Sequence, residues 1–300
     1  MGYFFELFFA GISRGSIYAL IALGYTMVYG IIGMINFAHG EIYMISAFVS
    51  LISAAGLLIF GVHPVGVFFG SLGFALVYGA LYGYTVERLA YRPLRNSPRL
   101  ACLISAIGMS IFLQNYVMLG QGSEIHPFPE LIPDLEFLEP FSHYLLSTDF
   151  VIITVTAIAM ILLLIFNRYS KTGKAMRAVS QDQTMAMLLG ININQIISMT
   201  FIIGSGLAAI AAVLIGTHMR QINYFIGFII GIKAFTAAVL GGIGSIGGAV
   251  LGGYILGMVE SFAAGYLSSS YKDVFAFSLL VIILIFRPAG LLGHKPIVKV

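Results

Sequence analysis

Long apolar runs follow one another along almost the whole chain, and few charged residues interrupt them. Of the 300 residues 59% are hydrophobic and only 9% are charged. A soluble domain carries about 25% charged residues, so a soluble chain of this composition could not cover its surface. A membrane-crossing helix needs about 20 apolar residues, whereas strands of a membrane barrel alternate over about ten. The continuous runs predict an all-α, polytopic membrane bundle of about eight to ten helices, which we expect to form a single domain over 1–300.

Nine apolar spans are predicted, although the glycines in the sixth to eighth make these hard to divide. A strongly broken helix or a re-entrant pair would change their number. The predicted spans are 7–31, 34–59, 64–86, 101–119, 150–167, 195–217, 225–245, 247–266 and 273–287.

The distribution of charge predicts which side of the membrane each connecting segment occupies. Residues 87–100 carry four arginines against Glu87, and residues 167–194 carry four Lys or Arg against Asp182. Residues 120–149 carry six acidic residues and neither Lys nor Arg. Since short basic segments stay in the cytoplasm, we expect the first two segments inside, 120–149 in the periplasm, the N-terminus outside and the C-terminus inside.

The glycines inside the spans recur in pairs four residues apart. In lipid, such spacing lets two helix backbones approach closely. We therefore expect these pairs to serve helix packing rather than ligand binding. They are Gly11/Gly15, Gly79/Gly83, Gly227/Gly231, Gly248/Gly252 and Gly253/Gly257.

The sequence contains one pattern that resembles a nucleotide-binding motif and a single cysteine, and neither indicates a binding site. Residues 242–247 match G-x-G-x-x-G, but that fingerprint needs a strand–turn–helix unit, and here it lies between two apolar spans. We predict a turn or helix break instead. Cys102 is the single cysteine, which excludes an internal disulfide and a cysteine-based metal site.

Polar residues interrupt the apolar pattern at 35–41, and a glycine-rich stretch interrupts it at 240–248. Broken hydrophobic segments in two halves of a chain are typical of helices around a transport path, and ionisable groups at membrane depth usually face a cavity or a partner. The candidates for a translocation path are Asn36, His39, Glu41, Gln114, Asn115, Gly242, Gly244 and Glu260.

Five of these candidates also have a purely structural interpretation. His39 and Glu41 fit equally well in a loop at the cytoplasmic interface, solvated or capping a helix. Glu260 fits a buried carboxyl group bound to Ser, Tyr or backbone groups. Hydrogen bonds between helices would explain Gln114 and Asn115.

A short helix is predicted within the basic segment 171–194. Ser180 and Gln183 have the spacing of a capping box, and Asp182 would lie in the first turn, where the helix dipole favours negative charge. Met185, Leu188 and Leu189 form one apolar stripe, and Gly190 stands where a left-handed residue would end the helix. Such a helix is marginal alone in water, so it either lies on the membrane surface or docks on a cytoplasmic partner.

Four stretches of the chain resemble one family closely, and the resemblance covers nearly the whole length. They are GYTMVYGIIGMINFAHGE (24–41), ERLAYRPLR (87–95), ISAIGMS (104–110) and KAFTAAVLGGIGS (233–245). The chain resembles the permease subunits of ABC importers for branched-chain amino acids, of the LivH type.

This resemblance implies an assembly of several chains in the bacterial inner membrane. A second, LivM-like permease would share the pore, two cytoplasmic ATPase subunits would bind ATP, and a periplasmic protein would deliver leucine, isoleucine or valine. This chain itself would be no enzyme and would hold no cofactor, metal or nucleic acid. The residues that the resemblance, together with the helix pattern, assigns to ATPase coupling are Arg177, Ala178, Asp182, Met185, Ala186, Leu188, Leu189 and Gly190.

Other functions stay open at this point. Similar permeases of the same family serve urea or short amides. An ion-coupled secondary transporter would use Glu41, His39 or Glu260 as its ion site, and a membrane scaffold would transport nothing. The chain alone does not identify the substrate, because in such importers the binding protein does much of the selecting.

Overall fold

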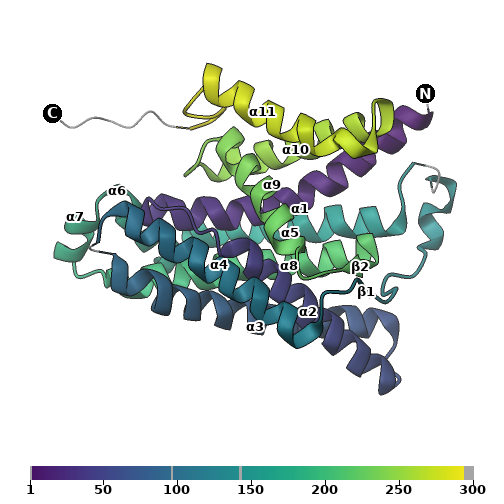
Figure 1. Cartoon of the computed structure of the whole chain (residues 1–300), viewed down its shortest axis with the longest axis horizontal. Coiled ribbons are helices and arrows are strands. Elements are labelled where there is room, and N and C mark those ends of the chain that lie inside the picture. Colours follow the sequence, from purple (N-terminus) through teal and green to yellow (C-terminus); the bar gives the residue numbers. More distant parts are fainter. Residues whose placement is uncertain (1, 96, 142–143, 294–300) are drawn as a thin grey trace.

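The computed structural model describes residues 2–95, 97–141 and 144–293, and this part of the chain is a bundle of helices (Figure 1). The predicted helical class is therefore confirmed. The α-helices are α1 (Gly2–Ile32), α2 (His39–Ile59), α3 (Pro64–Val86), α4 (Arg99–Gln121), α5 (Ser147–Tyr169), α6 (Lys171–Gln181), α7 (Gln183–Leu188), α8 (Ile193–Met219), α9 (Ile226–Gly241), α10 (Ile246–Tyr266) and α11 (Lys272–Phe286).

Shorter elements connect these helices. A π-helical turn (η1, Glu87–Tyr91) and a 3-10 turn (η2, Arg92–Leu94) prolong α3 into the basic segment, and two further 3-10 turns are η3 (Glu136–Phe141) and η4 (Ser269–Tyr271). The two strands β1 (His126–Pro127) and β2 (Gln221–Ile222) pair antiparallel. This pairing joins the long acidic segment to the turn between α8 and α9.

Every predicted span contains a helix, but the helix in one of the spans is short. Among the described residues, 8 helices or helix runs are long and apolar enough to cross a membrane. The helix in the predicted span 225–245 has only 16 residues, which gives about 24 Å at 1.5 Å per residue. The predicted end of this span at residue 245 was wrong, because the backbone leaves the helix at Gly242, where φ is +105°.

Helix α1 runs through the interior of the bundle, against α8, α9 and α10. All residues from Gly15 to Val28 are buried. The outer helices α4, α5 and α11 instead expose many large apolar side chains, as helices in contact with lipid do. The apolar character of each run therefore predicts a span, but only packing distinguishes inner from outer helices.

The glycine pairs act in helix packing, as predicted. A Cβ atom on Gly253 of α10 would overlap the α1 backbone at Ala19, and one on Gly257 would overlap it at Gly15. A Cβ atom on Gly252 would likewise overlap the backbone of Ala237 on α9. Small residues at these points let α1, α9 and α10 approach at backbone distance. The G-x-G-x-x-G stretch is the turn between α9 and α10, as predicted, and Ser245 caps α10 by accepting from Gly248 N at 3.1 Å.

The two basic segments meet at one end of the bundle. Arg95 Nη1 donates to Asn194 Oδ1 at 2.6 Å, and Gln183 Nε2 donates to the Ile31 carbonyl at the end of α1 at 2.8 Å. The acidic segment lies at the opposite end, where Glu130 pairs with Arg220 beyond α8. Figure 1 shows α6 and α7 at one end and β1 and β2 at the other.

The orientation of this bundle in the membrane is open to a direct test. Because basic segments stay inside, a cysteine introduced at the exposed Ser123 should react with a membrane-impermeant thiol reagent in intact cells, and one at Ser97 should react only after permeabilisation. The native Cys102 is buried, so background labelling should be low. The reverse pattern would overturn the predicted orientation.

Candidate functional sites

Helix α2 begins deep inside the bundle rather than at its surface. A Cβ atom on Gly24 of α1 would overlap the His39 ring, and Gly24 lies eight residues before the end of α1, about 12 Å along the helix. Residues 33–38 therefore fold back into the bundle before α2 starts. The interpretation of His39 and Glu41 as a solvated interface loop was wrong, since both are 1% exposed.

The polar groups of this broken segment bind to neighbouring helices. Asn36 Oδ1 accepts from the Tyr91 hydroxyl at 3.0 Å. Glu41 Oε1 accepts from Ser110 Oγ at 3.2 Å, whereas its Oε2 has no hydrogen-bond partner among the described residues. The His39 ring contacts the Tyr25 ring edge-on, with centroids 4.8 Å apart. The structure thus brings the predicted Asn36, His39 and Glu41 into one region of the interior.

The start of α9 meets the start of α2 in the same region. Gly227 and Gly231 lie against the Gly40 backbone, and a Cβ atom on Gly227 would come 2.6 Å from Glu41 Oε2. Two helices that begin inside the bundle are thus in backbone contact around a buried carboxyl group. Irregular backbone at membrane depth is tolerated only against protein or a water-filled cavity.

Glu260 is engaged in an ion pair between α9 and α10. Its Oε1 accepts from Lys233 Nζ at 2.7 Å and its Oε2 accepts from the Tyr18 hydroxyl at 2.5 Å. Lys233 also contacts Asp273 Oδ1 at 2.6 Å. The prediction of a carboxyl group bound to a Tyr is confirmed, but the lysine was missed. A single lysine inside an apolar span was the available signal, because buried charges are paired.

The remaining path candidates are not brought together. Asn115 donates to the Ile111 carbonyl of its own helix at 2.8 Å, and within the described part of the chain it does not form the expected hydrogen bond to another helix. Gln114 Nε2 has no partner among the described residues. Gly242 packs against the backbone of Gly290 and Gly293.

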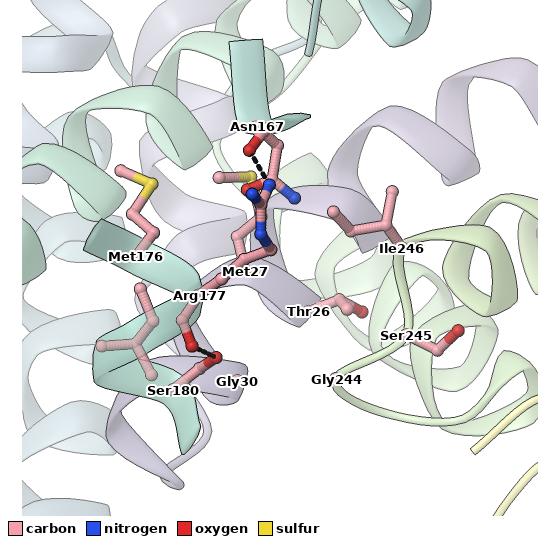
Figure 2. A pocket seen from close by; sticks show the side chains of 11 residues that line it. Thr26, Met27, Gly30, Asn167, Met176, Arg177, Ser180, Gly244, Ser245 and Ile246 are labelled. Atoms are coloured by element: carbon pink, nitrogen blue, oxygen red, sulfur yellow. Dashed lines mark hydrogen bonds between the residues drawn. The ribbon is translucent and has the colours of Figure 1, made fainter. Parts of the chain in front are cut away.

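Gly244, in contrast, lines a cavity of about 450 Å³ at the α6 end of the bundle (Figure 2). A Cβ atom there would meet nothing within 4 Å, although φ is +94°. The cavity is lined by Thr26, Met27, Gly30, Ile31, Asn167, Met176, Arg177, Ser180, Gly244, Ser245 and Ile246.

The basic segment 171–194 contains two helices where one was predicted. Asp182 separates α6 from α7 and is itself the N-cap of α7, because its Oδ1 accepts from Thr184 N and Met185 N at 2.9 and 3.0 Å. The predicted capping box was wrong, since Ser180 lies in the last turn of α6 and donates to the Arg177 carbonyl. Gly190 adopts the predicted left-handed conformation, with φ of +81°.

Helix α7 presents its apolar stripe outward. Met185, Leu188 and Leu189 are 59%, 77% and 79% exposed, while Ala186 is 2% exposed and anchors the helix. Ala178 in α6 is half-buried, and Arg177 donates to the carbonyls of Asn167 and Arg168 at the end of α5. The described part of this chain covers none of the three apolar side chains, so the stripe is free to contact another protein.

Comparison with known proteins agrees with the resemblance drawn from the sequence. Residues 7–284 match the family described as branched-chain amino acid transport system / permease component. The chain is 52% identical to the high-affinity branched-chain amino acid transport system permease protein LivH of Escherichia coli K12, over 99% of this chain and 98% of that protein. It is 51% identical to the corresponding permease protein BraD of Pseudomonas aeruginosa, over 97% and 96%.

A solved structure shares the fold. It is a metal-chelate type ABC transporter in an inward-facing conformation, 15% identical to this chain, with a TM-score of 0.52 over 93% of this chain and 86% of that one. The match to residues 7–284 and the near full-length identity to LivH and BraD show that the chain belongs to the family of branched-chain amino acid transport system permease components.

Proposed function

We propose that this chain is the LivH-type transmembrane subunit of an ATP-driven importer that carries leucine, isoleucine and valine across the bacterial inner membrane. Family membership supports the substrate class, and the spans support the location. The exposed apolar stripe of α7 is the main observation that supports a role in ATPase coupling. A LivM-like permease, two ATPase subunits that bind ATP, and a periplasmic binding protein would complete the assembly. In this assembly the chain performs no chemistry itself.

The contacts of α7 suggest how a partner's movement would reach the interior. Gln183, the first residue of α7, donates to the Ile31 carbonyl at the end of α1. Residues 33–38 follow directly and lead to His39 and Glu41, where α2 and α9 begin. A displacement of α7 would therefore pull on the re-entrant segment. The α2–α9 contact at Gly40 and Gly227 is the element that we expect to shift as the path opens to either side.

Uptake by the reconstituted complex tests this function against its alternatives. Proteoliposomes that contain the permease pair and the ATPase subunits should take up leucine only with ATP and the binding protein. Uptake by this chain alone, driven by a proton or sodium gradient, would instead support an ion-coupled transporter with Glu41 as the site. A preference for urea or short amides over leucine would keep the mechanism and overturn the substrate.

The turn between α9 and α10 provides a further test. Leucine in place of Gly244 would strain a left-handed backbone position and fill the cavity, but it would meet no packed atoms. We expect normal assembly and abolished uptake, measured as complex yield and as labelled leucine accumulated. Gly61→Leu is the control, because Gly61 also has a positive φ of 72° in open space. Normal uptake by an assembled Gly244→Leu complex would exclude this turn from the transport cycle.

A further inference from the structure

A groove lies between α3 and α8 at the end of the bundle where the two basic segments meet. Its volume of about 490 Å³ lies within the range of about 300–1,000 Å³ that is typical of ligand pockets. One wall comes from the end of α3 and from η2, and the other comes from residues 192–202 at the start of α8. The proposed transport function assigns no role to this groove.

The charge at the polar end of the groove is positive. Arg92 lines the groove, is exposed, and forms no ion pair within the described part of the chain. The exposed Arg88 lies one turn before it and is held against Tyr84, another wall residue. The Arg88 guanidinium lies 5.7 Å from the centroid of the Tyr84 ring, and its Nη1 donates to the Tyr84 hydroxyl at 2.5 Å. Two guanidinium groups without a carboxylate partner favour a phosphate group.

The acidic residue next to the groove is already neutralised. Glu87 is fully buried, and its Oε2 accepts from Oγ of the wall residue Ser198 at 2.8 Å. Its Oε1 pairs with Arg95, which also donates to Asn194 Oδ1, so the Asn194 amide nitrogen is the group left to donate to a ligand. No acidic side chain is among the described residues that line the groove. The ammonium group of a zwitterionic headgroup would therefore find no free carboxylate there.

Apolar side chains continue from the polar end along both helices. On α3, Val77 and Leu81 are exposed and lie on the same helix face as Tyr84, because residues three and four apart share a face. On α8, Met199 and Ile202 line the groove. Tyrosine is enriched at membrane interfaces, and arginine side chains extend from there toward the headgroups. The groove thus changes from charged to apolar along its length, as a phospholipid does.

We propose that this groove binds a phospholipid with a net negative headgroup in the cytoplasmic leaflet. Its phosphate faces the guanidinium groups of Arg88 and Arg92, the Asn194 amide supplies a neutral donor, and an acyl chain lies along Met199 and Ile202. Basic pockets between membrane helices on the cytoplasmic side are known to bind such headgroups. The proposal depends on the membrane spans and on the predicted orientation, and it does not depend on the transported substrate. The bound lipid would join the first basic segment to the start of α8.

Native mass spectrometry of the intact permease–ATPase complex, titrated with lipid in detergent, tests this proposal. The probes are phosphatidylglycerol, phosphatidylcholine with the same acyl chains, and glycerol 3-phosphate, which has no acyl chains. The lipid retained per complex is compared between wild type and Arg88→Gln/Arg92→Gln. Since one arginine near an anionic lipid contributes about fivefold in affinity, the double variant should bind phosphatidylglycerol at this site about twentyfold more weakly. Its retention of phosphatidylcholine should not change, and glycerol 3-phosphate should not displace phosphatidylglycerol.

Arg168→Gln is the matched control. Arg168 is also exposed, and its guanidinium lies 5.6 Å from the centroid of the neighbouring Tyr169 ring, but it does not line the groove. Its replacement should leave the retention of phosphatidylglycerol unchanged. Equal losses in Arg168→Gln and in the double variant would indicate diffuse attraction to a basic surface and would overturn the proposed site.

The other outcomes of the titration are equally decisive. Retention of phosphatidylglycerol at the wild-type level by the assembled double variant would overturn the proposal. Equal loss of both lipids would overturn the preference for a negative headgroup, and displacement by glycerol 3-phosphate would identify a site for a free phosphate ester. A double variant that releases the ATPase subunits but retains phosphatidylglycerol would identify the groove as a protein contact instead.

Discussion

Leu188→Asp is expected to release the ATPase subunits from the permease, or to uncouple ATP hydrolysis from uptake. Leu188 is 77% exposed in this chain, so the change should cost the permease itself little stability. In a docked complex, full burial of such a side chain would contribute about 1.5–3 kcal/mol, and aspartate would lose this contribution and also bury a charge. Every 1.4 kcal/mol is about tenfold in affinity. The measurement is co-purification of the ATPase subunits together with substrate-stimulated hydrolysis.

Two variants show whether the docking contact itself is responsible. Leu188→Met nearly conserves volume and apolar character and should behave as wild type. Asp182→Ala removes the N-cap of α7, which costs about 1 kcal/mol of helix stability, and should weaken coupling less than Leu188→Asp does. If Leu188→Asp retains both wild-type ATPase binding and wild-type stimulation, α7 is only a surface helix. The coupling contact would then have to lie elsewhere, for example in 87–100.

Lys233→Met is expected to destabilise the permease strongly. Lys233 and Glu260 are 4% and 2% exposed, and their side chains are 2.7 Å apart. Removal of the lysine leaves the Glu260 carboxylate buried without its counter-charge, which typically costs about 3–5 kcal/mol. Asp273, the other partner of Lys233, is 46% exposed at its side chain and can be hydrated. We therefore expect the main loss at Glu260, measured as a lower melting temperature and yield in detergent.

A double variant separates the ion pair from simple loss of a side chain. Lys233→Met combined with Glu260→Gln removes both charges and keeps an acceptor for the Tyr18 hydroxyl, so it should recover most of the stability. Lys171→Met, at an exposed position of α6, is the control and should melt like wild type. A Lys233→Met protein as stable as wild type would show that α9, α10 and α11 do not need this pair.

We expect coupling and stability to depend on different contacts. Helix α7 meets the end of α1 through Gln183, next to the re-entrant segment at His39 and Glu41. The Lys233–Glu260 pair joins α9 to α10, and Tyr18 extends it to α1. We expect variants at α7 to change hydrolysis and uptake at nearly constant stability, and variants at the pair to change stability first.

The sequence by itself determined the features that depend on local physics. Apolar length predicts the spans because a bilayer requires about 20 apolar residues per helix, and glycine pairs predict close packing because only small residues let backbones approach. The left-handed Gly190 and the break at 242–247 were also predictable, since backbone sterics act within a few residues. The family resemblance likewise rests on contiguous stretches.

Only the tertiary structure decided the depth and the partners of the polar residues. Nothing local distinguishes a His39 at the surface from one that lies against Gly24 inside the bundle. The pairing of Glu260 with Lys233, the free oxygen of Glu41 and the meeting of α2 with α9 depend on how separate helices cross. Helix crossing is set by the sum of many weak contacts between residues far apart in the chain. The sequence likewise placed the N-cap at Ser180, whereas α6 continues to Gln181 and Asp182, two residues after Ser180, caps α7.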